Sequence, residues 1–175
     1  MKKILIGFIA IGLLTFVGCE KEDDTEITDD SSIQYGEGAT DIDGNTYQSV
    51  IIGTQEWMVE NLRTTKYSDG TPIPNVTVNT EWGNLSTGAW CNYDNSSSND
   101  ATYGKLYNWY AVNTNKLCPT GWHVPTDLEW TVLTDYLTAN GHSGAEGTAL
   151  KATSGWNSGG NGTDDYGFLG LPGGN

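Results

Sequence analysis

Basic residues are scarce in this chain, in which 8 lysines and arginines stand against 22 aspartates and glutamates and give a net charge of −14 at pH 7. Because phosphate binding requires clustered Lys or Arg, nucleic acid is not expected as a partner. Histidine is scarcer still, since His123 and His142 are the only two. Neither stands in a His-Glu-x-x-His or paired Cys-x-x-Cys spacing, so the sequence predicts no metal site and no cofactor.

The chain has one long apolar run, Ile4 to Val17, which follows Lys2 and Lys3. The run is too short for a spanning helix and ends at a small-residue cleavage site, so residues 1–18 are predicted to be a secretory signal peptide. The segment Phe16-Val-Gly-Cys19 resembles a bacterial lipobox. On that interpretation Cys19 is the lipidated first residue of the mature chain, and the membrane is a partner through this anchor. The alternative is an ordinary signal peptide with an incidental cysteine.

Dense negative charge and few apolar residues mark the segment Glu20–Asp30 that follows Cys19. Such a segment cannot bury enough surface to fold, so residues 19–39 are predicted to be a disordered acidic tether. An acidic cluster behind a lipidated cysteine also resembles the signal that exports Bacteroidota lipoproteins to the outer face of the outer membrane. The predicted location is therefore the cell surface, although a simple charged spacer would look the same.

A helix start is encoded in the segment Cys118–Trp130, which reads Cys-Pro-Thr-Gly-Trp-His-Val-Pro-Thr-Asp-Leu-Glu-Trp. Thr126 is placed to cap the helix, and Glu129 three residues later completes a capping box. Apolar residues then recur at helical spacing, and Asn140-Gly141 supplies a stop, so a helix is predicted over 127–139. The predicted apolar stripe is Leu128, Val132, Leu133, Tyr136 and Leu137. The residues assigned to this structural motif are Trp122, His123, Thr126, Glu129 and Trp130.

The same segment resembles the hallmark of the Fibrobacter succinogenes major paralogous domain, a family abundant in surface proteins of Bacteroidota and Fibrobacter that has no settled biochemical function. Further matching segments occur in the family's order: Asp41–Tyr47, Ile52–Met58, Glu60–Leu62, Tyr103–Val112 and Leu169–Gly174. The resemblance covers residues 40–175 and implies one domain there. Family members continue to a final strand bearing a cysteine, so the domain is expected to be C-terminally incomplete.

A more distant resemblance links Val124–Trp130 to the helix start of formylglycine-generating enzymes, whose fold is related to C-type lectins. It implies an α+β fold with two helices, short antiparallel strands and long loops. The apolar spacing in Tyr103–Val112 predicts the first helix, and the capped helix is the second. The resemblance also suggests that Trp130 is buried. A strand is predicted over residues 166–171 and a polar loop over residues 92–100.

Asp43-Gly44 predicts a hairpin turn between Ile42 and the alternating Tyr47, Val50 and Ile52. The segment 41–45 is similar to a calcium loop, but its glycine is misplaced and residue twelve is Ile52 rather than Glu, which favours the turn. Cys91 and Cys118 are the two cysteines left after Cys19. Secretion permits a disulfide between them, although either one could instead pair with the family's C-terminal cysteine and leave a free thiol.

No catalytic residue is predicted, because His123 suits a structural hydrogen bond beside the capped helix and the enzymes' catalytic cysteines lie in a region this chain lacks. The chain is therefore not expected to be an enzyme. Aromatic rings stack on sugars and neighbouring polar groups orient hydroxyls. A ligand platform is accordingly predicted at Trp82, Trp90, Asn92, Tyr93 and Asp94, with simple core packing of the aromatics as the alternative. Three functions follow: a surface binding or adhesion module for a glycan or extracellular protein, a structural envelope or appendage subunit, and a degenerate relative of the oxidase.

Overall fold

The computed structural model describes residues 33–173. The predicted signal peptide, the Cys19 lipidation site and residues 20–32 of the predicted tether lie outside the described residues. Residues 33–39 were predicted to end the tether, but they belong to the folded domain, because Tyr35 bridges to Val50 and Ala39 pairs with Tyr47. In the described part of the chain, no helix is long and apolar enough to cross a membrane.

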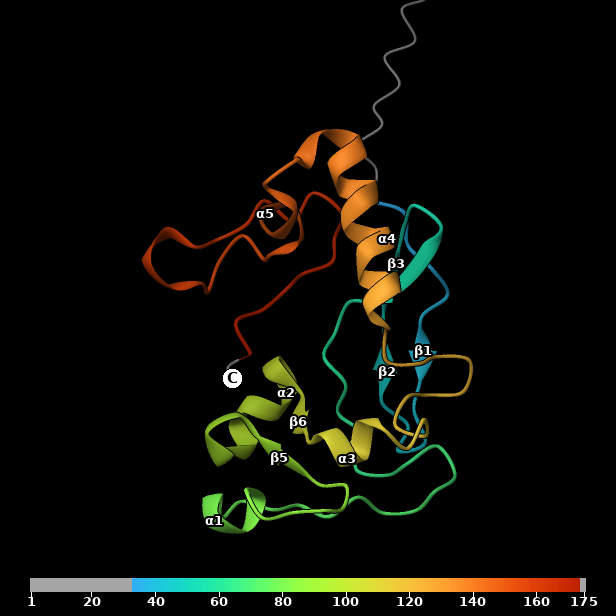
Figure 1. The fold of residues 1–175 in the computed structure, drawn as a ribbon, viewed down its shortest axis with the longest axis vertical. Coiled ribbons are helices and arrows are strands. Elements are labelled where there is room, and N and C mark those ends of the chain that lie inside the picture. The colour runs from blue at the N-terminus through green and yellow to red at the C-terminus, as the bar shows by residue number, and fades with distance from the viewer. Residues whose placement is uncertain (1–32, 174–175) are drawn as a thin grey trace, which may run out of the picture. The chain divides into compact units, whose positions relative to one another are not determined.

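The domain is built from three two-stranded antiparallel hairpins and a few helices (Figure 1). The hairpins join β1 (Ala39–Thr40) to β2 (Thr46–Tyr47), β3 (Ser49–Ile52) to β4 (Gln55–Met58), and β5 (Trp90–Asn92) to β6 (Lys105–Tyr107). The α-helices are α1 (Asn79–Trp82), α2 (Asp100–Tyr103), α3 (Trp109–Val112), α4 (Asp127–Leu137) and α5 (Glu146–Leu150). Helices and short antiparallel strands therefore share one domain, as the predicted α+β class requires.

The β1–β2 turn confirms the predicted hairpin and explains its acidic residues. Asp41 Oδ1 accepts the backbone N–H groups of Asp43 and Asn45, each at 2.9 Å, and its Oδ2 accepts the Tyr47 hydroxyl at 2.6 Å. Burial opposes ionisation of Asp43, but hydrogen bonds from Lys66 and Thr65 hold its pKa well below the usual range. Asp41 thus holds the turn together, whereas Asp43 links the turn to Thr65 and Lys66.

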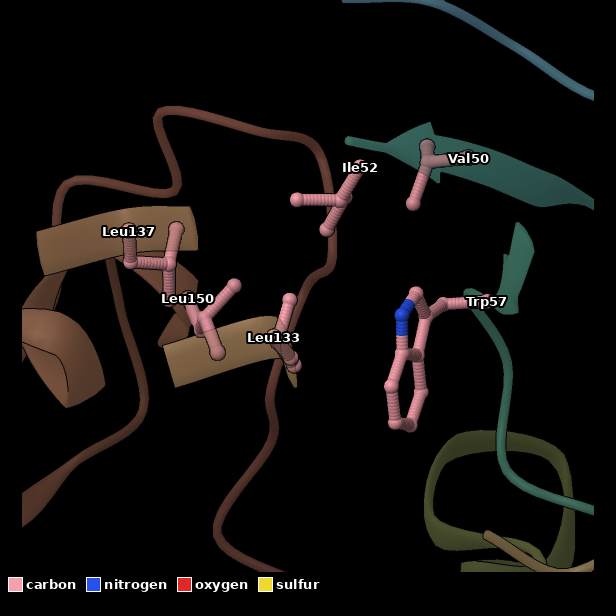
Figure 2. Packing of buried hydrophobic residues seen from close by; sticks show 6 residues of the cluster. All are labelled: Val50, Ile52, Trp57, Leu133, Leu137 and Leu150. Atoms are coloured by element: carbon pink, nitrogen blue, oxygen red, sulfur yellow. The ribbon is translucent and has the colours of Figure 1, made fainter. Parts of the chain in front are cut away.

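The core lies between the β3–β4 hairpin, α4 and α5. Figure 2 shows its six buried side chains facing one another: Val50, Ile52, Trp57, Leu133, Leu137 and Leu150. Val50 and Trp57 are direct cross-strand partners in the antiparallel register. Burial of these apolar groups supplies the main stabilisation that holds the helix against the hairpin.

The predicted apolar stripe of α4 is wrong in part. Leu133 and Leu137 are fully buried, whereas Leu128 is 71% exposed and Val132 is 40% exposed. One short hairpin covers only one side of the helix, so helical spacing alone did not identify the buried face. The predicted helix stop is confirmed, because α4 ends at Leu137, one wider turn follows, and Gly141 adopts φ 94°.

The first predicted helix, residues 103–112, is wrong. Its residues are divided among the end of α2, strand β6 and the short helix α3. Gly104 breaks the pattern, because its φ of 63° and ψ of −150° lie outside helical space and suit glycine alone. Lys105–Tyr107 then pairs with β5, and the Asn108 side chain caps α3 by accepting the Ala111 N–H. The aromatic spacing was compatible with a helix, but strand pairing decided the outcome.

Three further predictions also need correction. Residues 166–171 form only one isolated bridge, Gly170 to Lys151, because Leu169 has a left-handed φ of 55° that interrupts an extended strand. The predicted loop over residues 92–100 contains two short 3-10 turns, Tyr93–Asn95 and Ser97–Asn99. The predicted disulfide is not formed, since Cys91 and Cys118 are both free thiols.

Candidate functional site

The predicted capping box is present at the start of α4. Thr126 Oγ1 accepts the Glu129 N–H at 3.3 Å, and Glu129 Oε2 accepts the Thr126 N–H at 2.7 Å. The other carboxylate oxygen of Glu129 lies 2.7 Å from His123 Nε2, which places His123 in the structural hydrogen bond expected from the sequence. Hydrogen bonds from the Thr126 backbone and side chain, and then from His123, lower the pKa of Glu129 to about 2. The helix start is therefore a fixed polar unit.

A cleft of about 660 Å³ opens beside this unit. Its walls come from β4 and the residues that follow it, from the Leu117–Pro125 loop, from the first turn of α4, and from Phe168 near the C-terminal end. A hydrogen bond connects the β4 wall to the α4 wall, because Gln55 Nε2 donates to the Glu129 carbonyl at 3.0 Å. A cleft of this size matches those that bind small molecules.

Three aromatic rings form one wall of the cleft. The Trp57 and Trp130 ring centroids are 4.7 Å apart, and Phe168 lies 5.9 Å from Trp57 and 6.4 Å from Trp130. Trp57 is the buried base of the group, with 8% exposure, whereas Trp130 is 43% exposed. The expectation that Trp130 is buried is therefore wrong. Its ring packs on Trp57 and keeps a wide surface open.

Two buried polar atoms among the residues of this cleft have no hydrogen-bond partner within residues 33–173. They are Gln55 Oε1 and Trp57 Nε1. Buried polar groups in proteins are nearly always paired, often with a water or ligand, so these atoms are unusual.

The lining is acidic as well as aromatic. It contains Glu56, Glu60 and Glu129 but no lysine or arginine. Cys118 also lines the cleft, and burial raises the pKa of its thiol to about 11. Burial thus disfavours the thiolate form of this side chain. Across residues 33–173, no three His, Cys, Asp or Glu side chains are grouped to hold a metal ion.

None of the five predicted platform residues lines this cleft. Trp82 borders a smaller hollow of about 330 Å³ together with Cys91 and Asn95. Trp90 presents one face to Lys105, whose Nζ lies 4.5 Å from the ring centroid, and its Nε1 donates to the Ile73 carbonyl at 2.9 Å. One face and the ring N–H of Trp90 are therefore already engaged by the protein itself.

The other three platform residues lie where β5 runs into the 3-10 turns. Asn92 is the last residue of β5, and its Oδ1 is buried without a partner among the described residues. Tyr93 packs edge-on against Tyr103 with ring centroids 5.5 Å apart, and Asp94 is exposed at φ 53°. The structure thus distributes these residues over separate environments and does not form one platform from them.

The sequence did carry a signal for the residues that line the cleft. Segments quoted for the family resemblance supply its walls: Ile52–Met58, Glu60–Leu62, Tyr103–Val112 and Cys118–Trp130. The structural motif also contributes, since Trp122, His123, Glu129 and Trp130 all line the cleft. Gln55, Trp57 and Phe168 were missed as site residues, because spacing in sequence does not show that these segments meet.

Comparison with known proteins gives one family. The family described as the Fibrobacter succinogenes major domain matches residues 50–175, which include every residue of the cleft. No curated protein and no solved structure matches the chain.

Proposed function

The chain belongs to the Fibrobacter succinogenes major domain family, and from this premise we propose that it is a cell-surface lipoprotein whose aromatic cleft binds a carbohydrate. The observation that carries the proposal is the convergence of four family-like segments on one cleft with an exposed tryptophan face. Sugars bind proteins by placing their apolar face on an aromatic ring while nearby polar groups receive the hydroxyls.

The cleft supplies both kinds of contact. Trp130 offers the stacking surface, and the Trp57 and Phe168 rings hold it in place from behind. His123, Glu129 and Asn61 line the same space and present groups that donate to or accept from hydroxyls. Since the capping box fixes Glu129, its carboxylate needs little ordering on binding.

Surface display is the second part of the proposal. The lipobox-like Phe16–Cys19 and the acidic segment behind it support export and anchoring through a lipid on Cys19. Attachment through Cys19 would leave the domain able to reach an extracellular ligand.

We also infer a relationship to the C-type lectin and formylglycine-generating enzyme folds. The Val124–Trp130 helix start supports it, together with the short hairpins around α4. Fold likeness does not carry activity with it.

A structural envelope subunit is the second candidate, and one observation favours it. Leu128, Val132 and Tyr136 lie one turn apart along α4 and are exposed by 71%, 40% and 37%. Such a stripe suits packing against a neighbouring subunit. Purification in a stoichiometric assembly, with binding to oligosaccharides undetectable, would favour this function over the first.

The test of carbohydrate binding uses the purified full chain on an oligosaccharide array, followed by titration of tryptophan fluorescence with any bound sugar. Trp130→Ala should weaken binding at least about tenfold, because it removes the stacking surface. The matched control is Trp109→Ala, since Trp109 is 67% exposed and lies outside the cleft. An array with no bound member, or equal loss in both variants, would rule out the proposal.

A further inference from the structure

The charge of the cleft restricts which sugar it can hold. Three of its lining residues, Glu56, Glu60 and Glu129, are acidic, but Glu56 lies on the face of β4 opposite Trp57 and its carboxylate accepts from the Ser49 hydroxyl and the Glu37 N–H. Glu60 and Glu129 are therefore the carboxylates that carry the argument. Glu60 Oε2 accepts the Gln48 N–H at 2.6 Å, and Glu129 is held by Thr126 and His123. These contacts keep two carboxylates at fixed positions beside the aromatic wall.

The lysines and the arginine within residues 33–173 make contacts away from the cleft. In the described part of the chain, Lys66, Lys105 and Lys116 pair with Asp43, Asp100 and Asp69. Arg63 lies over the Tyr47 ring, and Lys151 lies over the Trp156 ring. None of these five residues lines the cleft. His123 is the only lining residue able to carry a positive charge, and it is bonded to Glu129.

A cleft lined by one sign of charge focuses its field on an entering ligand. A uronate, sialate or sulfate group would bring a negative charge towards fixed carboxylates and lose its hydration without gaining a cation. An amino group would gain both a carboxylate and an aromatic face. A neutral sugar would meet neither the repulsion nor the added attraction, so its affinity should lie between those of acidic and amine-bearing sugars.

We propose that the cleft selects uncharged and amine-bearing glycans and rejects acidic ones. The inference rests on the carbohydrate-binding function proposed above and specifies the ligand class of the same cleft.

The experiment uses the full chain on an immobilised panel of neutral, amine-bearing and acidic oligosaccharides. The panel includes matched β-1,4-linked tetramers of glucose, glucosamine and glucuronate, which share one backbone and differ in charge. Acidic members should bind at least about tenfold more weakly than their neutral counterparts at low salt. Raising the salt concentration should narrow that difference, because screening weakens repulsion.

Glu60→Gln tests the origin of the selectivity, since glutamine keeps the oxygen that accepts the Gln48 N–H and removes only the charge. It should reduce the discrimination against acidic members about threefold. Asp135→Asn makes the same change of charge at an exposed position of α4 outside the cleft and should leave discrimination unchanged. Acidic members that bind as tightly as neutral ones would overturn the inference and leave carbohydrate binding intact. A panel with no bound member would overturn the proposed function itself.

Discussion

At the scale of single residues, Trp130 is the side chain whose role changed most between sequence and structure. The family resemblance suggested a buried core tryptophan, but 43% of its surface is exposed above Trp57. Truncation of a buried tryptophan costs about 3–5 kcal/mol, and partial exposure should lower that cost well below this range. Trp130 is thus better placed to contact a ligand than to hold the fold.

Glu129→Gln should change how stability depends on pH. The folded protein lowers the pKa of Glu129 from 4.5 to about 2, so its charged form is favoured in the folded state. This contribution to the free energy of unfolding is fully present above pH 4.5 and is lost as the pH falls towards 2. Urea unfolding of wild type and variant between pH 7 and pH 2 should therefore show a stability difference that shrinks with acid. Asp135→Asn, on the same helix but outside the capping box, is the control, and a wild-type advantage that grows with acid would contradict the assignment.

At the scale of elements, α4 shows how packing selects one face of a helix. Capping, length and stop signal were all readable from local residues. Which apolar residues are buried depended on the position of the β3–β4 hairpin, which contacts the side carrying Leu133 and Leu137. Exposed apolar residues of the same type occur on the other side.

A pair of leucine substitutions tests this orientation. Leu133→Ala should lower the free energy of unfolding by about 3 kcal/mol, because it leaves a cavity at a fully buried site. Leu128→Ala on the same helix should change it by less than about 0.5 kcal/mol, since that side chain is 71% exposed. Chemical denaturation of both variants measures the difference, and equal losses would mean that α4 presents a different face to the core.

Gly104→Ala tests the break between α2 and β6. An added Cβ would lie 2.6 Å from the Leu62 carbonyl oxygen, and φ is 63° there. The substitution should destabilise the domain by about 2 kcal/mol or more. Gly83→Ala is the control, because its φ of −66° is ordinary and the nearest atom is 3.5 Å away. Thermal melting of both variants should show a lower Tm for Gly104→Ala alone, and an unchanged Tm would restore the possibility of a continuous helix.

At the scale of the whole molecule, the net negative charge and the predicted targeting signals bear on where the protein acts and on what it binds. The pI of about 4.1 reflects an excess of carboxylates along the whole chain, including the segment behind Cys19. The same excess of negative charge underlies the proposal that the cleft rejects acidic glycans.

Cys19→Ala should release the protein from membranes, because a lipid anchor on that residue supplies the attachment in our proposal. Fractionation of expressing cells measures the membrane-bound share. Replacing Glu22, Asp23 and Asp24 with alanine should instead reduce protease access on intact cells while keeping the anchor. Wild-type membrane binding of Cys19→Ala would refute the lipoprotein hypothesis.

The sequence by itself determined the family, the capped start and glycine stop of α4, and the Asp43-Gly44 hairpin. These features depend on neighbours within a few residues, where side-chain and backbone geometry are set locally. Only the tertiary structure decided that residues 105–107 form a strand, that Cys91 and Cys118 stay apart as thiols, and that Trp57, Trp130 and Phe168 share a wall. Those outcomes depend on which distant segments meet, and burial of a common apolar surface makes that choice.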